Sequence, residues 1–193
     1  MRSDVLRPGE LFPDYELPDQ DGILQRLSAL QDNDPMVLVL SRGSYCPKDQ
    51  LQHRDLVRLA PALSVSYTSL VTIATDPIET LRDWRAELGA PWPFLSDTAR
   101  RIQRDLGIQE YTDPYYDPMI PYTLVLLPGL KIHKVYNGYW FWGRPSNEEL
   151  HRDLREASRL CRPDWDITTP ELRKNWASDR RLHYPYERST VLE

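Results

Sequence analysis

A short apolar run, Met36 to Leu40, leads directly into segment 42–49, whose sequence is Arg-Gly-Ser-Tyr-Cys-Pro-Lys-Asp. The run is aliphatic, partly β-branched and bounded by Pro35 and Gly43, which is typical of a buried strand. Apolar residues at helical spacing follow over 49–63, and a proline at position 47 suits the first helical position. The chain is therefore predicted to pass from a buried strand into a helix at Cys46.

A cysteine at a strand-to-helix turn has two interpretations. Unpaired backbone N–H groups and the positive end of the helix dipole favour the thiolate, lowering a cysteine pKa to about 3.5–7.5 from about 8.5. Alternatively, a free cysteine is simply a small buried hydrophobe. We favour a reactive Cys46, because Arg42 and Lys48 add positive charge and Gly43 with Ser44 forms a small loop for substrate approach. This hypothesis requires an ionised thiol that is not buried away from solvent.

Composition narrows the class of protein. The chain has 193 residues, a formal net charge of −5 and no basic cluster, so a nucleic-acid partner is not expected. No apolar stretch reaches membrane-spanning length, so no membrane partner is expected either. Two distant cysteines and the lack of a signal-peptide core predict a reducing, cytoplasmic location. Four scattered histidines offer no zinc spacing, and we expect neither metal nor cofactor.

The order of predicted elements indicates a mixed α/β domain. We expect a small opening β-hairpin over 12–17 and 23–27, strands over 36–41, 70–74, 92–95, 122–127 and 132–136, and helices over 47–63, 78–88, 97–106 and 147–160. Asp76 is expected to cap the helix over 78–88 and Gly89 to end it, and the sequence Ser-Asn-Glu-Glu at 146–149 predicts a capping box for the last helix. This order predicts a mixed central sheet with helices on both faces, formed by residues 1–161.

Residues 162–193 are polar and rich in Pro and Arg, with scattered aromatic residues. We expect a C-terminal extension that wraps the domain or meets a second subunit. A partly disordered tail is an equally good interpretation of this composition.

Several segments together resemble the peroxiredoxins, the alkyl hydroperoxide reductase and thiol-specific antioxidant group of the thioredoxin fold. The sequence Cys-Pro-Lys-Asp at 46–49 is similar to the Cys-Pro-Thr-Glu around that family's peroxidatic cysteine. Segment 71–76 with Trp84, and segment 88–97, resemble the family's strand-Ser-x-Asp and Phe-Pro-Leu-Leu-Ser-Asp regions. The resemblance covers roughly residues 8–160 and implies a thioredoxin-like fold and reduction of hydroperoxides.

The chain departs from this family at two positions. The family's threonine, three residues before the cysteine, is Gly43 here, and the strand expected over 122–127 lacks the family's second catalytic arginine at its start. Ile120-Pro121 instead resembles the thioredoxin segment whose cis-proline faces the active cysteine. We expect Ser44 to supply a hydroxyl, and Arg42 or Arg144 to supply positive charge.

The resemblance assigns further candidates. With Cys46, Arg42 and Ser44 as catalytic residues, we expect the substrate-binding residues to be Gly43, Tyr45, Pro121, Trp140 and Arg144. Asp49 and His53 have supporting roles, since a carboxylate in the first helical turn caps N–H groups and a histidine four residues later can bond to residue 49. The charge of Asp49 opposes a nearby thiolate and requires a cationic partner, Arg42 or Arg144.

Cys161 has two interpretations as well. Some family members place a resolving cysteine near the C-terminus, yet Leu150, Leu154, Ala157 and Cys161 form one helical stripe that predicts a core position. We therefore prefer a one-cysteine enzyme.

Three functions fit these observations. The leading hypothesis is a peroxiredoxin-like thiol oxidoreductase that acts on a hydroperoxide and is recycled by an external thiol or thioredoxin-type reductant, with a homodimer as its candidate assembly. The second is a monothiol disulfide reductase that docks a protein partner. The third is a thioredoxin-fold binding module without catalysis, since fold alone does not decide function.

Overall fold

The computed structural model describes residues 6–140, 142–163, 166 and 168–178. By its internal contacts the chain divides into one unit that ends at Cys161 and a second that begins at Arg162. None of the described helices is both long and apolar enough to cross a membrane.

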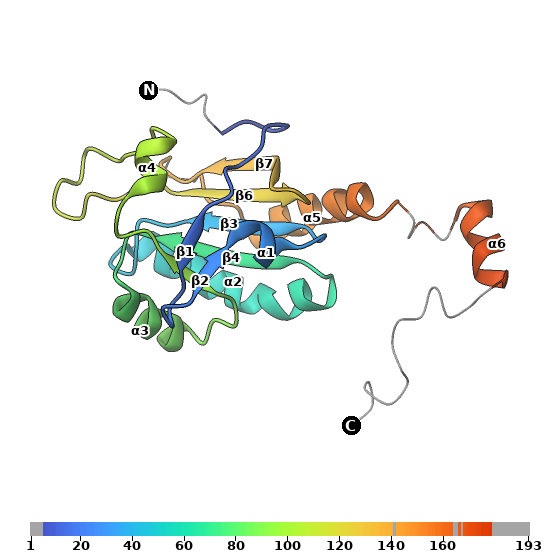
Figure 1. The fold of residues 1–193 in the computed structure, drawn as a ribbon, viewed down its shortest axis with the longest axis horizontal. Helices are drawn as coiled ribbons and strands as arrows, with labels where there is room; N and C mark the ends of the chain where they lie inside the picture. The colour runs from blue at the N-terminus through green and yellow to red at the C-terminus, as the bar shows by residue number, and fades with distance from the viewer. Residues whose placement is uncertain (1–5, 141, 164–165, 167, 179–193) are drawn as a thin grey trace. The chain divides into compact units, whose positions relative to one another are not determined.

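A five-stranded mixed sheet organises the first unit, in the order β5-β4-β3-β6-β7 (Figure 1). The central strand β3 (Met36–Leu40) pairs in parallel with β4 (Ser69–Ala74) and antiparallel with β6 (Tyr122–Leu127). The sheet is completed by β5 (Phe94–Ser96), parallel to β4, and by β7 (Lys131–Asn137), antiparallel to β6. The predicted mixed sheet with helices on both faces is thereby confirmed.

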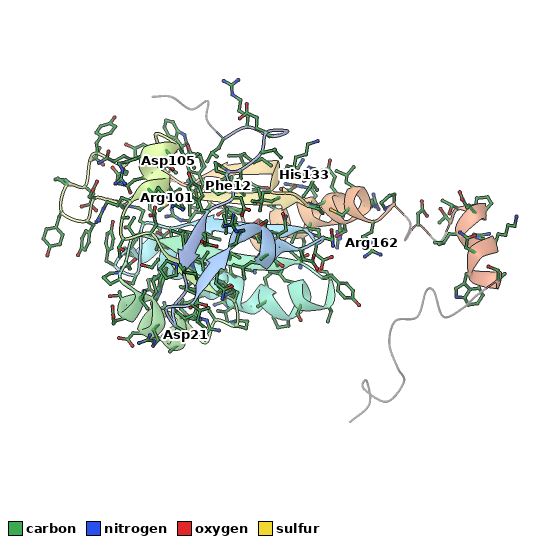
Figure 2. The ribbon with its side chains drawn as sticks, in the orientation of Figure 1. Phe12, Asp21, Arg101, Asp105, His133 and Arg162 are labelled. Carbon is green, nitrogen blue, oxygen red and sulfur yellow. The ribbon has the colours of Figure 1, made fainter. Side chains whose placement is uncertain are left out.

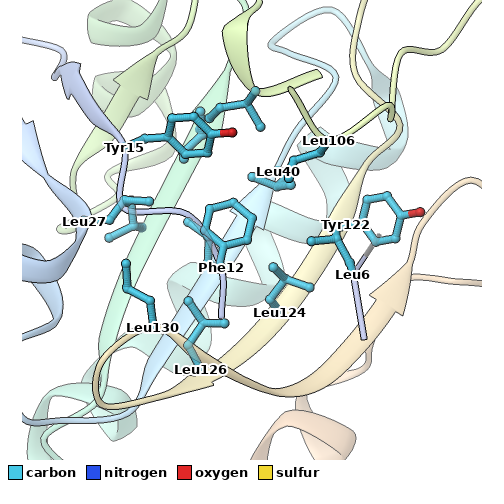
Figure 3. Close-up of a cluster of buried hydrophobic side chains, with 14 of the residues drawn as sticks. Leu6, Phe12, Tyr15, Leu27, Leu40, Leu106, Tyr122, Leu124, Leu126 and Leu130 are labelled. Carbon is cyan, nitrogen blue, oxygen red and sulfur yellow. The ribbon is translucent and has the colours of Figure 1, made fainter. Parts of the chain in front are cut away.

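Both faces of the sheet are buried, which is why β3 is apolar at all five positions. Side chains 36, 38 and 40 point to one face and join a core with Phe12, Tyr15 and residues of β6 (Figure 3). Side chains 37 and 39 point to the other face and pack with residues of three helices, α2 (Pro47–Val65), α3 (Ile78–Leu88) and α5 (Asn147–Cys161).

The amino-terminal segment covers the first of these faces. It contains β1 (Glu16–Pro18) and β2 (Leu24–Arg26), an antiparallel pair that confirms the predicted hairpin, and the short helix α1 (Leu27–Gln31). Helix α4 (Arg101–Asp105), whose two end residues are labelled in Figure 2, contacts this segment. Tyr15 donates a hydrogen bond to Asp105 at 3.2 Å, and the Arg101 guanidinium lies over the Tyr15 ring.

Three predicted helix signals have clear outcomes. Gly89 ends α3 in the left-handed conformation, as expected. Ser146 and Glu149 form a reciprocal capping box at the start of α5, as the sequence Ser-Asn-Glu-Glu predicts. The prediction that Asp76 caps α3 is wrong: Pro77 is the N-cap residue, and the Asp76 carboxylate is bound to Ser44 instead.

The second unit contains one described helix, α6 (Pro170–Ser178), which begins at a proline after Thr169. The aromatic residues predicted to mark this extension include Trp165, Tyr184 and Tyr186, which lie outside the described residues. The role of residues 162–193 therefore stays a prediction.

Candidate active site

Cys46 lies where the sequence places it, at the passage from β3 to α2. It is the N-cap residue of α2, its backbone N–H donates to the Gly43 carbonyl at 3.2 Å, and its side chain makes no capping hydrogen bond. The thiol is free, and the residue is only 3% exposed. The expectation of an accessible thiol is therefore wrong, because the residue is buried.

A hollow of about 400 Å³ opens beside this turn. Its walls include Arg42, Pro121 and Arg144, three of the predicted site residues. Cys46, Ser44, Tyr45 and Trp140 are not among the lining residues; Trp140 is 62% exposed, and its neighbour Tyr139 lines the hollow instead.

A buried ion pair forms one wall. Asp49 is fully buried on the first turn of α2, and Arg144, from the loop between β7 and α5, donates to its Oδ1 from Nε at 2.9 Å and from Nη2. The other oxygen, Oδ2, accepts from the Ser41 hydroxyl at 3.1 Å and from the Arg42 backbone N–H at 2.8 Å. The predicted cationic partner of Asp49 is thus Arg144, and Asp49 binds the turn before Cys46 rather than capping its own helix.

The Arg42 guanidinium faces two carboxylates on the opposite wall. Its Nη2 lies 2.9 Å from both Glu110 Oε2 and Asp113 Oδ2, while the Tyr45 hydroxyl donates to the same Asp113 oxygen at 3.1 Å. The Tyr45 ring stacks on Tyr116, with centroids 3.5 Å apart. The segment 110–116 is therefore fastened to the two residues Arg42 and Tyr45 that flank the Gly43–Ser44 turn.

Sequence reasoning missed Glu110 and Asp113. A signal was present, because an arginine at a strand end that is expected to be partly buried requires carboxylate partners. Those partners lie about seventy positions along the chain, where no local pattern points to them.

The Gly43–Ser44 turn is closed rather than open to substrate. Gly43 is buried at φ +126°, and a Cβ added there would collide with the Asp76 carboxylate. The expected approach through this turn is therefore wrong: the space in front of Gly43 is filled by Asp76. The open hollow lies on the Arg42 and Arg144 side of the turn.

His53 is a structural residue, as predicted. Its Nδ1 lies 2.7 Å from the Asp49 carbonyl, which can only accept, so Nδ1 carries the hydrogen and Nε2 accepts from the Thr72 hydroxyl at 3.0 Å. Burial lowers the pKa of His53 below its ordinary value, against the opposing effect of the hydrogen bond to Asp49. This histidine is neutral and does not face the hollow.

Two further expectations concern Pro121 and Cys161. The Ile120–Pro121 peptide bond is trans, so the expected cis-proline is wrong, although Pro121 does line the hollow. On α5, Leu150, Leu154 and Ala157 are buried as the stripe predicts, whereas Cys161 at the helix end is half-buried.

Comparison with known proteins identifies the family. The sequence profile of the AhpC/TSA family matches residues 8–135. The chain belongs to this family. It is also 30% identical over 107 residues to a protein of Mycobacterium tuberculosis assigned to the peroxiredoxins, a match that covers 54% of this chain and 68% of the relative.

Solved peroxiredoxin structures share the fold. Peroxidoxin BcpB from Mycobacterium tuberculosis superposes with a TM-score of 0.67 at 23% identity, covering 80% of this chain and 97% of that one. A mutant of peroxiredoxin 6 from Arenicola marina gives 0.69 at 14% identity and 88% coverage of both chains. AhpC from Enterococcus faecalis gives 0.68 at 16% identity, covering 86% of this chain and 99% of that one.

Membership of this family makes the chain a thiol-dependent peroxidase, with a hydroperoxide as substrate and a thiol as reductant. Cys46 and Pro47 lie within the residues that the family profile matches.

Proposed function

We propose that Cys46 carries the peroxidase reaction and that Cys161 is not required for it. The supporting observation is the position of Cys46 at the N-cap of α2, where the positive end of the helix dipole lies. Arg42, four residues before Cys46 in the sequence, lines the hollow beside this turn.

The reaction follows from thiolate chemistry. The Cys46 thiolate attacks one oxygen of the hydroperoxide, so that an S–O bond forms, the O–O bond breaks and the alkoxide leaves as an alcohol after taking a proton. The sulfur becomes a sulfenic acid. An external thiol displaces water from it to give a mixed disulfide, and a second thiol releases reduced Cys46 together with a disulfide.

The hollow supplies the route for the substrate. Arg42, Pro121 and Arg144 line it, and the two guanidinium groups can polarise a peroxide oxygen as negative charge develops. Because a peroxide oxygen must touch the sulfur and Cys46 is nearly enclosed, the proposal requires a path for the peroxide from the hollow to Cys46.

The burial of Cys46 is also what a thioredoxin-fold binding module without catalysis would show. Iodoacetamide separates the two functions: a peroxidase shows rapid alkylation of Cys46, together with hydroperoxide consumption. A binding module shows slow alkylation and no consumption. Turnover rates are also measured with a glutathione mixed disulfide. A disulfide reductase would turn over this substrate faster than a hydroperoxide.

Location and assembly belong to the same proposal. We place the protein in the cytoplasm, where thiol reductants keep cysteines reduced. We also propose a homodimer, because Trp140 and Trp142 are 62% and 89% exposed and large exposed aromatics are typical of contact surfaces. Sedimentation equilibrium of the full chain tests the dimer; a single monomer mass at micromolar concentration contradicts it.

A further inference from the structure

Two helices on the same face of the sheet carry exposed stripes of opposite charge. The acidic stripe lies on α3 at spacing i, i+4 and i+8, and consists of Glu79, Asp83 and Glu87. The basic stripe lies on α5 at the same spacing, and consists of His151, Arg155 and Arg159. All six residues are exposed. Residues four apart lie above one another on a helix, so each stripe extends about 12 Å along its helix.

The acidic stripe is not compensated by the basic residues of its own helix. Arg82 lies 3.9 Å from Asp21, in the turn between β1 and β2, and Arg85 donates to the Trp92 carbonyl at 2.8 Å. Among the described residues, no basic side chain forms an ion pair with an acid of the stripe. Like charges four residues apart destabilise a helix, so this stripe is unfavourable in the isolated chain.

The basic stripe is uncompensated in the same way. Two acids of α5 are engaged with the sheet, since Glu156 pairs with Lys134 of β7 at 3.0 Å and Asp153 accepts from the Tyr136 hydroxyl. Within the part of the chain that the structure describes, no acid pairs with a member of the basic stripe. The formal net charge of the chain is −5, which makes this stripe a local exception.

A groove of about 350 Å³ lies between α5 and the end of α2. The basic stripe forms one of its walls, while Ala62 and Leu63 of α2 add apolar surface. The groove therefore suits an element that combines acidic side chains with a small apolar one. The outer face of α3 has this composition, because Ala86 is exposed between Asp83 and Glu87.

The three helices of this face run in the same direction. Helices α2 and α3 each connect parallel neighbouring strands, so both run opposite to those strands. Helix α5 runs alongside α2, because Asn147 at its start donates to the Asp55 carbonyl and Arg159 near its end lines the groove with Ser66.

This arrangement is complementary to itself. Helix α3 packs at β5 and α5 at β6, on opposite sides of the central strands, and α2 contacts both helices. A twofold axis parallel to α2 therefore places α3 of one copy opposite α5 of the other, twice, with both helices in the same direction.

We propose that the chain forms a twofold dimer in which the acidic stripe of one copy faces the basic stripe of the other. The charges then pair in order, with Asp83 opposite Arg155 in the middle of each contact. Trp142 belongs to the same surface, since it lines a second hollow with Leu51 near the start of α2. This proposal rests on the homodimer proposed above, and it goes beyond it by naming the surface and the charges that select a second copy.

The experiment reverses the middle charge of each stripe, with Arg155→Glu, Asp83→Lys and a chain that carries both changes. The dimer Kd of the full-length protein is measured by sedimentation equilibrium at low and at high salt. Each single reversal makes two attractive pairs per dimer repulsive, so the Kd at low salt should rise by about tenfold or more. The native dimer should weaken at high salt, because exposed charge pairs are screened.

Restoration separates pairing from a general effect of charge. Both changes in one chain should restore the native Kd. An equimolar mixture of the Arg155→Glu and Asp83→Lys proteins should form a mixed dimer, since each middle pair then joins opposite charges. The matched control is Arg104→Glu, an exposed arginine of α4 on the other face of the sheet, which should leave the Kd unchanged.

Three results overturn the inference and leave the proposed homodimer standing: a native dimer that resists both reversals, equal weakening by Arg104→Glu, or a mixture that does not dimerise. A native protein that stays monomeric at micromolar concentration and low salt overturns the homodimer as well. The reaction proposed at Cys46 is tested separately, by peroxide consumption.

Discussion

Breaking the buried pair between Asp49 and Arg144 tests how the site is held together. Asp49 is fully buried and the Arg144 side chain is 13% exposed, so Arg144→Met leaves a carboxylate without its cation in a dry environment. Removing one partner of a buried pair costs about 3–5 kcal/mol. Asp49 keeps hydrogen bonds from the Ser41 hydroxyl and the Arg42 amide, which places the expected loss at about 3 kcal/mol.

The assay is urea and thermal unfolding of the full chain. For a chain of this size, a loss of about 3 kcal/mol lowers the Tm by roughly 6–12 °C. Asp49→Asn should cost less, about 1–2 kcal/mol, because an unpaired Arg144 can turn its head group toward water in the hollow. The double variant, with no buried charge, should recover most of the loss caused by Arg144→Met.

An exposed pair supplies the control. Arg58 and Asp55 lie only 2.6 Å apart, yet both are well exposed on α2. Arg58→Met should therefore cost less than about 1 kcal/mol. The reasoning is refuted if Arg144→Met costs no more than Arg58→Met, or if the Asp49 and Arg144 losses simply add in the double variant.

Two other predictions follow from the same geometry. Gly43→Ala should lose about 2–4 kcal/mol, from the strained φ and the collision with Asp76. Gly22→Ala, also at positive φ but with open space, should lose only about 1 kcal/mol by circular dichroism melting, and equal losses would contradict this account. The lowered pKa of His53 means that the unfolded chain takes up a proton which the folded chain refuses, so stability falls as the pH drops below about 6.5. His53→Gln should reduce the change in the urea midpoint between pH 7.5 and 5.5. An unchanged pH dependence of this midpoint would show that His53 does not cause it.

Local sequence patterns predicted the helices and strands well. The alternation of β3 between two cores, the start of α2 at Pro47 and the capping box of α5 are set by neighbouring residues, and each lies where the sequence indicates. The family resemblance predicted Cys46, Arg42 and Arg144 in one region, because the spacing of a family's motifs along the sequence reflects the fold that its members share.

The partners of the site residues were harder to predict. Asp76 lies 32 positions from Ser44, and Asp113 lies 68 positions from Tyr45, so their contacts depend on how loops meet in three dimensions. An aspartate that follows a strand is also a common helix N-cap, so the sequence alone indicates that Asp76 caps α3. Tyr139 lines the hollow, whereas the adjacent Trp140 does not. The sequence does not indicate which of two adjacent aromatic residues a turn directs into a hollow.

The most direct test of the central claim is to find which sulfur is oxidised. The full-length protein is exposed to one equivalent of hydroperoxide, trapped with dimedone and digested for mass spectrometry, alongside Cys46→Ser and Cys161→Ser. The account predicts sulfenic acid on Cys46, full peroxide consumption in Cys161→Ser and none in Cys46→Ser. Undiminished consumption by Cys46→Ser, or adducts only on Cys161, would contradict it.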